Sequence, residues 1–136
     1  MNITIETTIA APITRVWAAW TTPADIQQWN AASDDWHTTR AAVDLRVGGV
    51  FSSRMEAKDG SMGFDFAGTY TAVVEDELIV FAMDDGRVVR IEFAAGATGT
   101  TVRETFEAEA THSVEQQRQG WQAILDNFAR HVLTRA

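Results

Sequence analysis

The order of two hydrophobic patterns constrains the fold more than any other feature of the sequence. From about residue 38 to residue 109, apolar and polar residues alternate in short runs, which is typical of β-strands. Turn signals such as Lys58-Asp59-Gly60 and Asp84-Asp85-Gly86 separate these runs. The pattern predicts about six short strands joined by tight turns, as in an antiparallel meander.

After these runs the spacing becomes helical. Ser113 can cap a helix together with Gln116, which lies three residues later. One stripe then recurs at steps of three and four residues: Val114, Gln117, Trp121, Leu125, Phe128 and Val132, with Ile124 beside it. We expect one long amphipathic helix that packs this stripe against the sheet.

Further signals precede the strands. Residues 2–9 alternate and are rich in β-branched side chains, which predicts a first strand. Pro12 suits the first turn of a helix, and Thr22-Pro23 provides a hydroxyl cap with Pro at the first helical position of another. The chain therefore reads as a strand, two short helices, a series of strands and a long helix. The predicted fold class is α+β.

Composition narrows the context. The 136 residues are 46% hydrophobic, which is enough for one core, and we expect a single domain over residues 1–136. The chain has no cysteine, no apolar run long enough to cross a bilayer and no signal-peptide pattern at its start, so we expect a cytoplasmic protein. A net charge of −8 argues against binding to nucleic acid or to an anionic membrane.

Particular residues also resemble a known family. They include Asp44 to Gly49, Phe64 to Tyr70, Asp85-Gly86-Arg87 and Gly120-Trp121, within an order of elements that matches over essentially the full length. The chain resembles the START-like (SRPBCC) helix-grip superfamily, and within it the homologues of the activator of heat-shock-protein-90 ATPase.

The resemblance implies a curved antiparallel sheet of about six to seven strands that grips the C-terminal helix, with a largely apolar cavity between them. It does not imply one reaction, since such proteins include lipid, hormone and polyketide binders as well as cyclases. The eukaryotic co-chaperone of the family has an extra N-terminal domain that contacts the chaperone. Because this sequence starts at the first strand, we do not expect chaperone contact.

A cavity in such a fold would be lined by the concave strand face and by the inner stripe of the last helix, mostly with apolar walls and a few polar groups. The residues that we expect to line it are Trp29, Trp36, His37, Phe51, Ser53, Met55, Phe64, Phe66, Phe81, Met83, Val89, Ile91, Phe93, Glu104, Trp121, Leu125 and Phe128. The same side chains could instead simply fill a core.

Glu104 is the most informative of these residues. It shares a strand face with Val102 and Phe106, which pattern as inward, and a buried carboxylate must be paired, hydrogen-bonded or protonated. Glu104 could orient a ligand or act as a general acid or base, or it could reach solvent at the sheet rim. His37, which we place in the irregular segment after the second short helix, could join Trp29 and Trp36 as a lid, or could be a solvated loop residue.

Other catalytic chemistries have little support. We expect His112 and His131 to be surface residues, and the three separated histidines lack the spacing of a metal site. No serine lies in a G-x-S-x-G motif, and Gly48-Gly49 is not a phosphate loop because a strand follows it. We therefore expect neither a metal nor a cofactor.

Three functions remain, in this order. The first is binding of a hydrophobic or aromatic small molecule, with no defined catalysis. The second is a cofactor-free cyclase, dehydratase or isomerase in which Glu104, with His37 or Tyr70, moves protons. The third is an interaction module, including chaperone regulation, which would need a sizeable exposed apolar patch. A homodimer is compatible with exposed strand edges.

Overall fold

The computed structural model describes residues 1–134, so residues 135–136 of the predicted domain lie outside the described range. The elements, in chain order, are β1 (Asn2–Ile9), α1 (Ile13–Thr21), α2 (Pro23–Trp29), β2 (Trp36–Val43), β3 (Val50–Ala57), β4 (Gly63–Val74), β5 (Leu78–Met83), β6 (Val88–Gly96), β7 (Gly99–Glu107) and α3 (Val114–Thr134). This is the α+β order that the sequence predicts. None of the helices in the described residues is long and apolar enough to cross a membrane.

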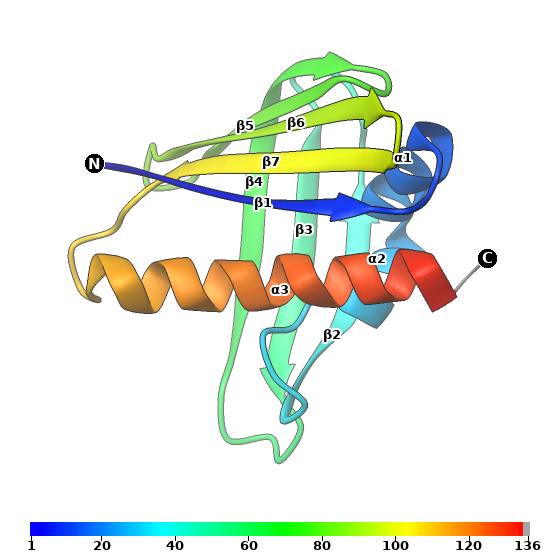
Figure 1. Cartoon of the computed structure of the whole chain (residues 1–136). Helices are drawn as coiled ribbons and strands as arrows, with labels where there is room; N and C mark the ends of the chain where they lie inside the picture. Colours follow the sequence, from blue (N-terminus) through cyan, green and yellow to red (C-terminus); the bar gives the residue numbers. More distant parts are fainter. Residues whose placement is uncertain (135–136) are drawn as a thin grey trace.

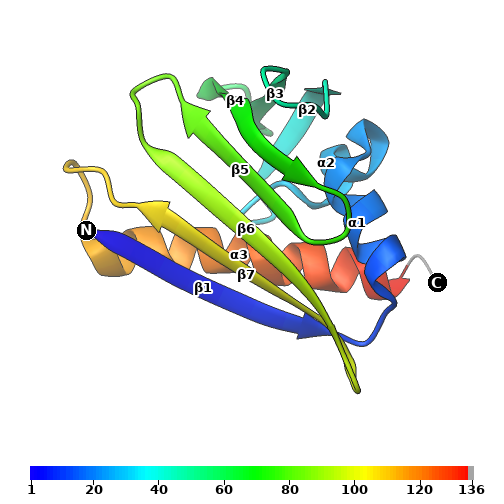
Figure 2. The same ribbon diagram turned by 90° about the horizontal axis from the view of Figure 1, so that it is seen from above.

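The strands form one antiparallel sheet in the order β1-β7-β6-β5-β4-β3-β2. Strands β2 to β7 follow one another as a meander, and β1 returns to pair with β7, with Ile5 opposite Glu104. Figure 1 shows β1 and β7 running along α3, whereas β2, β3 and β4 cross it. Seen from above, the sheet curls over α3, and α1 and α2 lie at the end near the C-terminus (Figure 2). The fold is therefore the helix grip that the resemblance implies.

Irregularities in the strands accompany this curl. The β4–β5 register shifts between Tyr70 and Ala72, and such bulges increase the local twist of a strand. At Gly68 on β4, an added Cβ would lie 2.9 Å from ring atoms of both Phe51 and Phe81. The missing side chain lets these two rings meet edge to face, with centroids 4.6 Å apart. Gly68 thus allows close aromatic packing over the backbone of β4, near its register shift.

The densest core lies where α1 and α2 meet the C-terminal half of α3. Phe128 is fully buried, and its ring packs edge to face on Trp20 and on Trp29, with centroids 4.9 Å apart in both pairs. Phe93 of β6 contacts Trp17 and Trp20 from the sheet side. Leu125 and Val132 are each only 1% exposed. This end of the molecule is therefore filled by side chains.

The helix starts agree in part with the sequence. The amide of Gln116 donates to Ser113 Oγ, and the Gln116 side chain accepts from the Ser113 amide, which confirms the predicted capping box. Pro12 is the residue before α1 rather than within its first turn. Thr22 precedes α2 with Pro23 in the first turn, but its hydroxyl makes no capping hydrogen bond. Pro23 alone therefore fixes this start, because its ring already has a helical φ.

Candidate functional site

A cavity of about 370 Å³ lies between the concave face of the sheet and the N-terminal half of α3. Its walls are mainly aromatic and aliphatic. The lining residues are Trp20, Ile26, Trp29, Asn30, Val43, Phe51, Ser53, Met55, Phe64, Phe66, Tyr70, Ile79, Phe81, Met83, Arg87, Glu104, Glu109, His112, Gln117, Trp121 and Ile124.

The orientation of Trp121 helps to keep this space open. Its indole lies flat on Phe106 of β7, with ring centroids 3.9 Å apart and planes 10° from parallel. Phe66 of β4 meets the edge of the same indole at 6.1 Å. Because the largest side chain of this half of α3 stacks along the sheet, it does not fill the interior between α3 and β3 to β5.

Besides Gln117, whose amide group is hydrogen-bonded within the protein, four polar side chains in the cavity wall are more than nine-tenths buried: Asn30, Ser53, Tyr70 and Glu104. Within residues 1–134, the side-chain polar atoms of these four residues have no hydrogen-bond partner in the protein. Every described side-chain polar atom that is fully shielded from solvent does have a partner. Their polar atoms therefore border the open space of the cavity. A bound molecule could supply the missing partners.

Glu104 lies on β7 between Ile5 of β1 and Ile91 of β6 and is 7% exposed, so the prediction that it faces inward is confirmed. Burial raises the pKa of Glu104 to about 8, and no neighbouring charge contributes to the shift. The carboxyl is therefore mostly protonated at neutral pH. In that form it can both donate and accept a hydrogen bond.

Burial, together with the nearby Asp44 carboxylate, also raises the pKa of Tyr70, to about 12. Its phenol therefore stays protonated throughout the physiological range. Tyr70 stands beside Phe51, with ring centroids 5.4 Å apart, and offers a neutral hydroxyl at the β4 side of the cavity.

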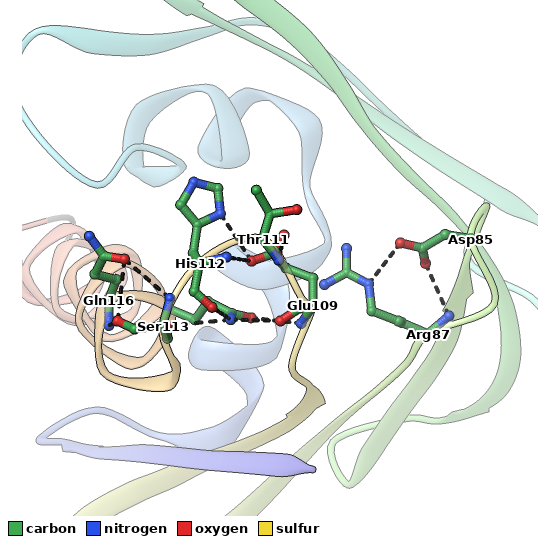
Figure 3. A network of polar contacts seen from close by, with 8 residues as sticks. Asp85, Arg87, Glu109, Thr111, His112, Ser113 and Gln116 are labelled. Carbon is green, nitrogen blue, oxygen red and sulfur yellow. Dashed lines mark hydrogen bonds and ion pairs between the residues drawn. The ribbon is translucent and has the colours of Figure 1, made fainter.

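A network of polar groups, drawn in Figure 3, includes residues at the rim of the cavity. Gln117 donates to the carbonyl oxygens of Glu109 and His112, and its side-chain oxygen accepts from the Glu109 amide. His112 Nδ1 lies 3.0 Å from Glu109 Oε1, and Arg87 Nε lies 2.8 Å from Asp85 Oδ2. Both lining residues that can be cationic are thus already beside carboxylates.

Burial alone would raise the pKa of Glu109, but hydrogen bonds from His112 and Thr111 outweigh it and hold the pKa below its usual value. Glu109 is therefore ionised near neutral pH, unlike Glu104. The two carboxyl groups of the cavity have opposite tendencies because Glu109 accepts several N–H groups and Glu104 accepts none.

The structure places many of the predicted residues around the cavity. They are Trp29, Phe51, Ser53, Met55, Phe64, Phe66, Phe81, Met83, Glu104 and Trp121. They come from β3, β4, β5, β7, the end of α2 and the N-terminal half of α3.

Other predicted lining residues lie elsewhere. Val89, Ile91, Phe93, Leu125 and Phe128 are buried in the hydrophobic core and do not line the cavity. The strand β2 begins at Trp36, so His37 is not in an irregular segment: it stands opposite Glu56 of β3. Trp36 packs on Phe64 at 5.9 Å, outside the cavity. The predicted lid of Trp29, Trp36 and His37 is therefore not formed.

Sequence reasoning missed several wall residues. Ile79 and Gln117 were recoverable, since Ile79 alternates with its strand neighbours and Gln117 lies on the predicted helix stripe. Other wall residues reach the cavity only because segments that are distant in the sequence come together. The β5–β6 hairpin brings Arg87 to the rim, and the β7–α3 connection brings His112 there. The remaining missed residues are Trp20, Ile26, Asn30, Val43, Glu109 and Ile124, whereas Tyr70 was expected in the cavity only as a proton-transfer partner of Glu104.

The histidines also differ from expectation. His131, expected at the surface, has a side chain only 8% exposed, and its Nε2 lies 2.8 Å from Asp25 Oδ1 of α2. His112 is exposed but stands at the cavity rim. In the described part of the chain, no three His, Asp or Glu residues are placed to hold a metal ion.

Comparisons with known proteins agree with this fold. Residues 10–132 match the family model described as Activator of Hsp90 ATPase homolog 1-like protein. A solution structure of a protein of this type from Aeromonas hydrophila is 54% identical, with a TM-score of 0.93, over 98% of this chain and 93% of that one.

A protein from Cytophaga hutchinsonii is 44% identical, with a TM-score of 0.85, over 98% of this chain and 93% of that one. A protein from Nitrosomonas europaea, 19% identical with a TM-score of 0.82 over 99% of this chain and 96% of that one, shares the fold. No protein of curated function matches the sequence. The matched residues and the helix-grip fold together show that the chain belongs to the family of Activator of Hsp90 ATPase homolog 1-like proteins.

Proposed function

We propose that this protein binds a small, mainly apolar or aromatic molecule in the cavity between the sheet and the N-terminal half of α3. The cavity of about 370 Å³ carries this proposal. Ligand sites are commonly concave, of roughly 300–1,000 Å³, and mainly apolar with a few placed polar groups. This cavity has that size and that composition.

The contrast with ordinary packing supports the same conclusion. Protein interiors are close-packed, and voids larger than a water molecule are few. A cavity of this size loses dispersion contacts and destabilises the fold unless something occupies it. The aromatic side chains around it, such as Phe51, Phe66 and Phe81, are held by edge-to-face contacts with one another. The cavity is thus built into the fold.

Binding is better supported than catalysis. The proton-transfer enzyme considered from the sequence pairs Glu104 with His37 or Tyr70. His37 is on the far strand β2 and does not line the cavity, and the Tyr70 phenol keeps its proton because its pKa is raised to about 12. An interaction module, including a chaperone regulator, has no separate observation in its favour.

Native mass spectrometry of the protein purified from its own cells, followed by solvent extraction, tests this function. We expect a small molecule bound in stoichiometric amount. Phe66→Trp should displace it, because the larger ring fills space beside Trp121 and Phe81. Val88→Trp is the matched control, since Val88 is exposed on the outer face of β6 and does not line the cavity.

Two results would count against binding. One is a wild-type protein that is empty after purification and stays empty after incubation with a panel of apolar aromatic and lipid compounds. The other is a bound molecule that Phe66→Trp retains as fully as Val88→Trp does. Glu104→Gln separates a binder from an enzyme, because a binder keeps its affinity within a few-fold whereas an enzyme of this type loses turnover.

A further inference from the structure

The four unpartnered polar side chains of the cavity are not spread evenly over its wall. Ser53 lies on β3, Tyr70 on β4, and Asn30 follows α2 and is tied to β2, where Thr38 Oγ1 donates to its carbonyl at 2.7 Å. Glu104 lies on β7, and β4, β5 and β6 separate β7 from β3 in the sheet. Four strand spacings of about 4.8 Å, roughly 19 Å, separate β7 from β3 around the curled sheet. The paired registers also offset the two residues along the strands, because Glu104 lies level with Val73 of β4 and Ser53 lies level with Phe66. They therefore stand on opposite walls, with aromatic rings between them.

Charge inside the cavity is equally uneven. The lining side chains that can be cationic, Arg87 and His112, are both at the rim and lie beside Asp85 and Glu109. No charged group acts on Glu104, whose own charge is suppressed by burial alone. The interior thus offers hydrogen bonds but no free cationic side chain to pair with an anionic ligand. A cationic ligand would need an ionised Glu104, and a charge on Glu104 is unfavourable in an apolar wall.

From this arrangement we infer that the ligand is an apolar-bodied molecule carrying neutral hydrogen-bonding groups, such as hydroxyls or carbonyls, at two opposite ends, one end meeting Glu104 and the other meeting Ser53 with Asn30 or Tyr70. This inference rests on the proposed binding function and narrows it. A plain hydrocarbon would leave both polar walls unpaired, and a fatty acid would bring an anion with no cation to receive it. The molecule that fits satisfies both walls and fills the aromatic space between them.

Three rod-shaped fluorescent probes of nearly equal size test it: trans-stilbene, its para-hydroxy derivative and its para,para′-dihydroxy derivative. A fourth, stilbene with a para-carboxylate, adds an anion. Fluorescence titrations of the intact protein at neutral pH would give the four affinities. Each hydroxyl that completes a hydrogen bond should raise the affinity about three- to tenfold, which is the net worth of such a bond. The carboxylate should bind more weakly than the dihydroxy probe.

Variants of Glu104 and Ser53 identify which wall residue bonds each hydroxyl of the probe. Glu104→Leu should abolish the gain from one hydroxyl while trans-stilbene binds as well as to the wild type or better. Glu104→Gln, which keeps shape and hydrogen-bonding capacity, should keep most of the gain and also guards against a folding defect in the leucine variant. Ser53→Ala should reduce the gain from the other hydroxyl. Val88→Ala, on the outer face, should change none of the four affinities.

The outcomes distinguish a wrong inference about the ligand from a wrong binding function. If trans-stilbene binds in the cavity but the hydroxyls add nothing, or if their gain survives in both Glu104→Leu and Ser53→Ala, the inference about the ligand is wrong and the binding function stands. A carboxylate probe that binds more tightly than the dihydroxy probe would also overturn it. If the folded wild-type protein binds none of the four, both the inference and the binding function are contradicted.

Discussion

The two halves of α3 belong to one stripe of the sequence, yet they face different interiors. In the C-terminal half, Leu125, Phe128 and Val132 are at most 1% exposed and lie in a closed core. In the N-terminal half, Gln117, Trp121 and Ile124 border the cavity. The difference comes from the partner side: α1 and α2 insert tryptophans against one half, and nothing comparable is inserted against the other. Helical periodicity sets which face turns inward but not whether that face is filled.

The polar groups divide in the same way. At the packed end, His131 is buried beside Asp25, with Nε2 and Oδ1 2.8 Å apart. At the cavity end, the side-chain polar atoms of Asn30, Ser53, Tyr70 and Glu104 border the open cavity and make no hydrogen bond within residues 1–134. Buried polar groups are normally hydrogen-bonded, so groups that face an open space without partners indicate a place for a ligand. One end of the molecule is therefore packed by side chains, and the other borders the cavity that we propose as the binding site.

The largest expected effect is on the packed half. Phe128→Ala should lower the free energy of unfolding by about 3–5 kcal/mol, since it leaves a void among Trp20, Trp29 and Leu125. Trp121→Ala should cost less than half of that, because this side chain is already partly exposed and borders empty space. Urea unfolding of both variants measures the contrast, and equal losses would contradict the division of α3 into two halves.

The next largest effect is a pH dependence of the free energy of unfolding, which comes from Glu104 in the cavity wall. The pKa of Glu104 is about 8 in the folded protein against an ordinary value of 4.5. Between these values the unfolded chain releases this proton and the folded protein keeps it. The contribution of Glu104 to stability is therefore fully present below about pH 4.5 and is lost as the pH rises through about 8.

Glu104→Gln removes this titration. Relative to the variant, the wild type should lose roughly 2–4 kcal/mol of unfolding free energy between about pH 5 and pH 9, with the gap widening up to about pH 8 and levelling off above it. Denaturant unfolding of both proteins across that range provides the measurement, and the difference between them cancels the other titrating groups. Parallel curves would show that the Glu104 carboxyl is solvated or paired in solution.

A moderate effect is expected at the curved strand that faces the cavity. In Gly68→Ala the new methyl group would lie 2.9 Å from both Phe51 and Phe81, so these rings must move. We expect a loss of about 1–3 kcal/mol, which is typical of overpacking, together with weaker ligand binding. Thermal unfolding and a binding titration would check both parts. Stability that falls without any change in binding would separate Gly68 from the cavity.

The smallest effect concerns the start of α3. Ser113→Ala removes the hydroxyl that accepts from the Gln116 amide and should cost about 1 kcal/mol. Because the N-terminal half lacks dense packing beneath it, this loss should appear as faster amide exchange in the first turns of α3. Exchange near Leu125 and Phe128 should change only as far as global stability does. A uniform increase along the helix would mean that both halves open together.

The sequence predicted the fold well because each element depends on local patterning. Alternation identified the strands, and the stripe of α3 and the Ser113–Gln116 cap identified the helix, while the family resemblance placed them in a helix grip. The site was harder. Alternation marks Ile91 and Phe93 as inward in the same way as Phe81 and Met83. Only the tertiary structure shows that the first pair is packed in the core, with Phe93 against Trp17 and Trp20 of α1, whereas the second pair lines the cavity.

The residues at the rim of the cavity could not be predicted from local sequence patterns, for a different reason. Arg87 and His112 are 25 positions apart in the sequence and reach one end of the cavity through a hairpin and a connecting loop. His37 was wrongly predicted to lie in an irregular segment. The start of β2 at Trp36 depends on its pairing with Ala57 of β3, which no local sequence pattern predicts. Glu104 was found because a carboxyl on an otherwise apolar strand face is conspicuous in one dimension.

The most direct test of the central claim is an NMR titration of the ¹⁵N-labelled protein with trans-stilbene. The account predicts shift changes on β3, β4 and β5 and on α3 from Gln117 to Ile124, with little change around Phe128 and Val132. Saturation at one equivalent would accompany them. Shift changes confined to the outer face of the sheet, or no change at all in a folded protein, would contradict the claim that the N-terminal half of α3 covers a binding cavity.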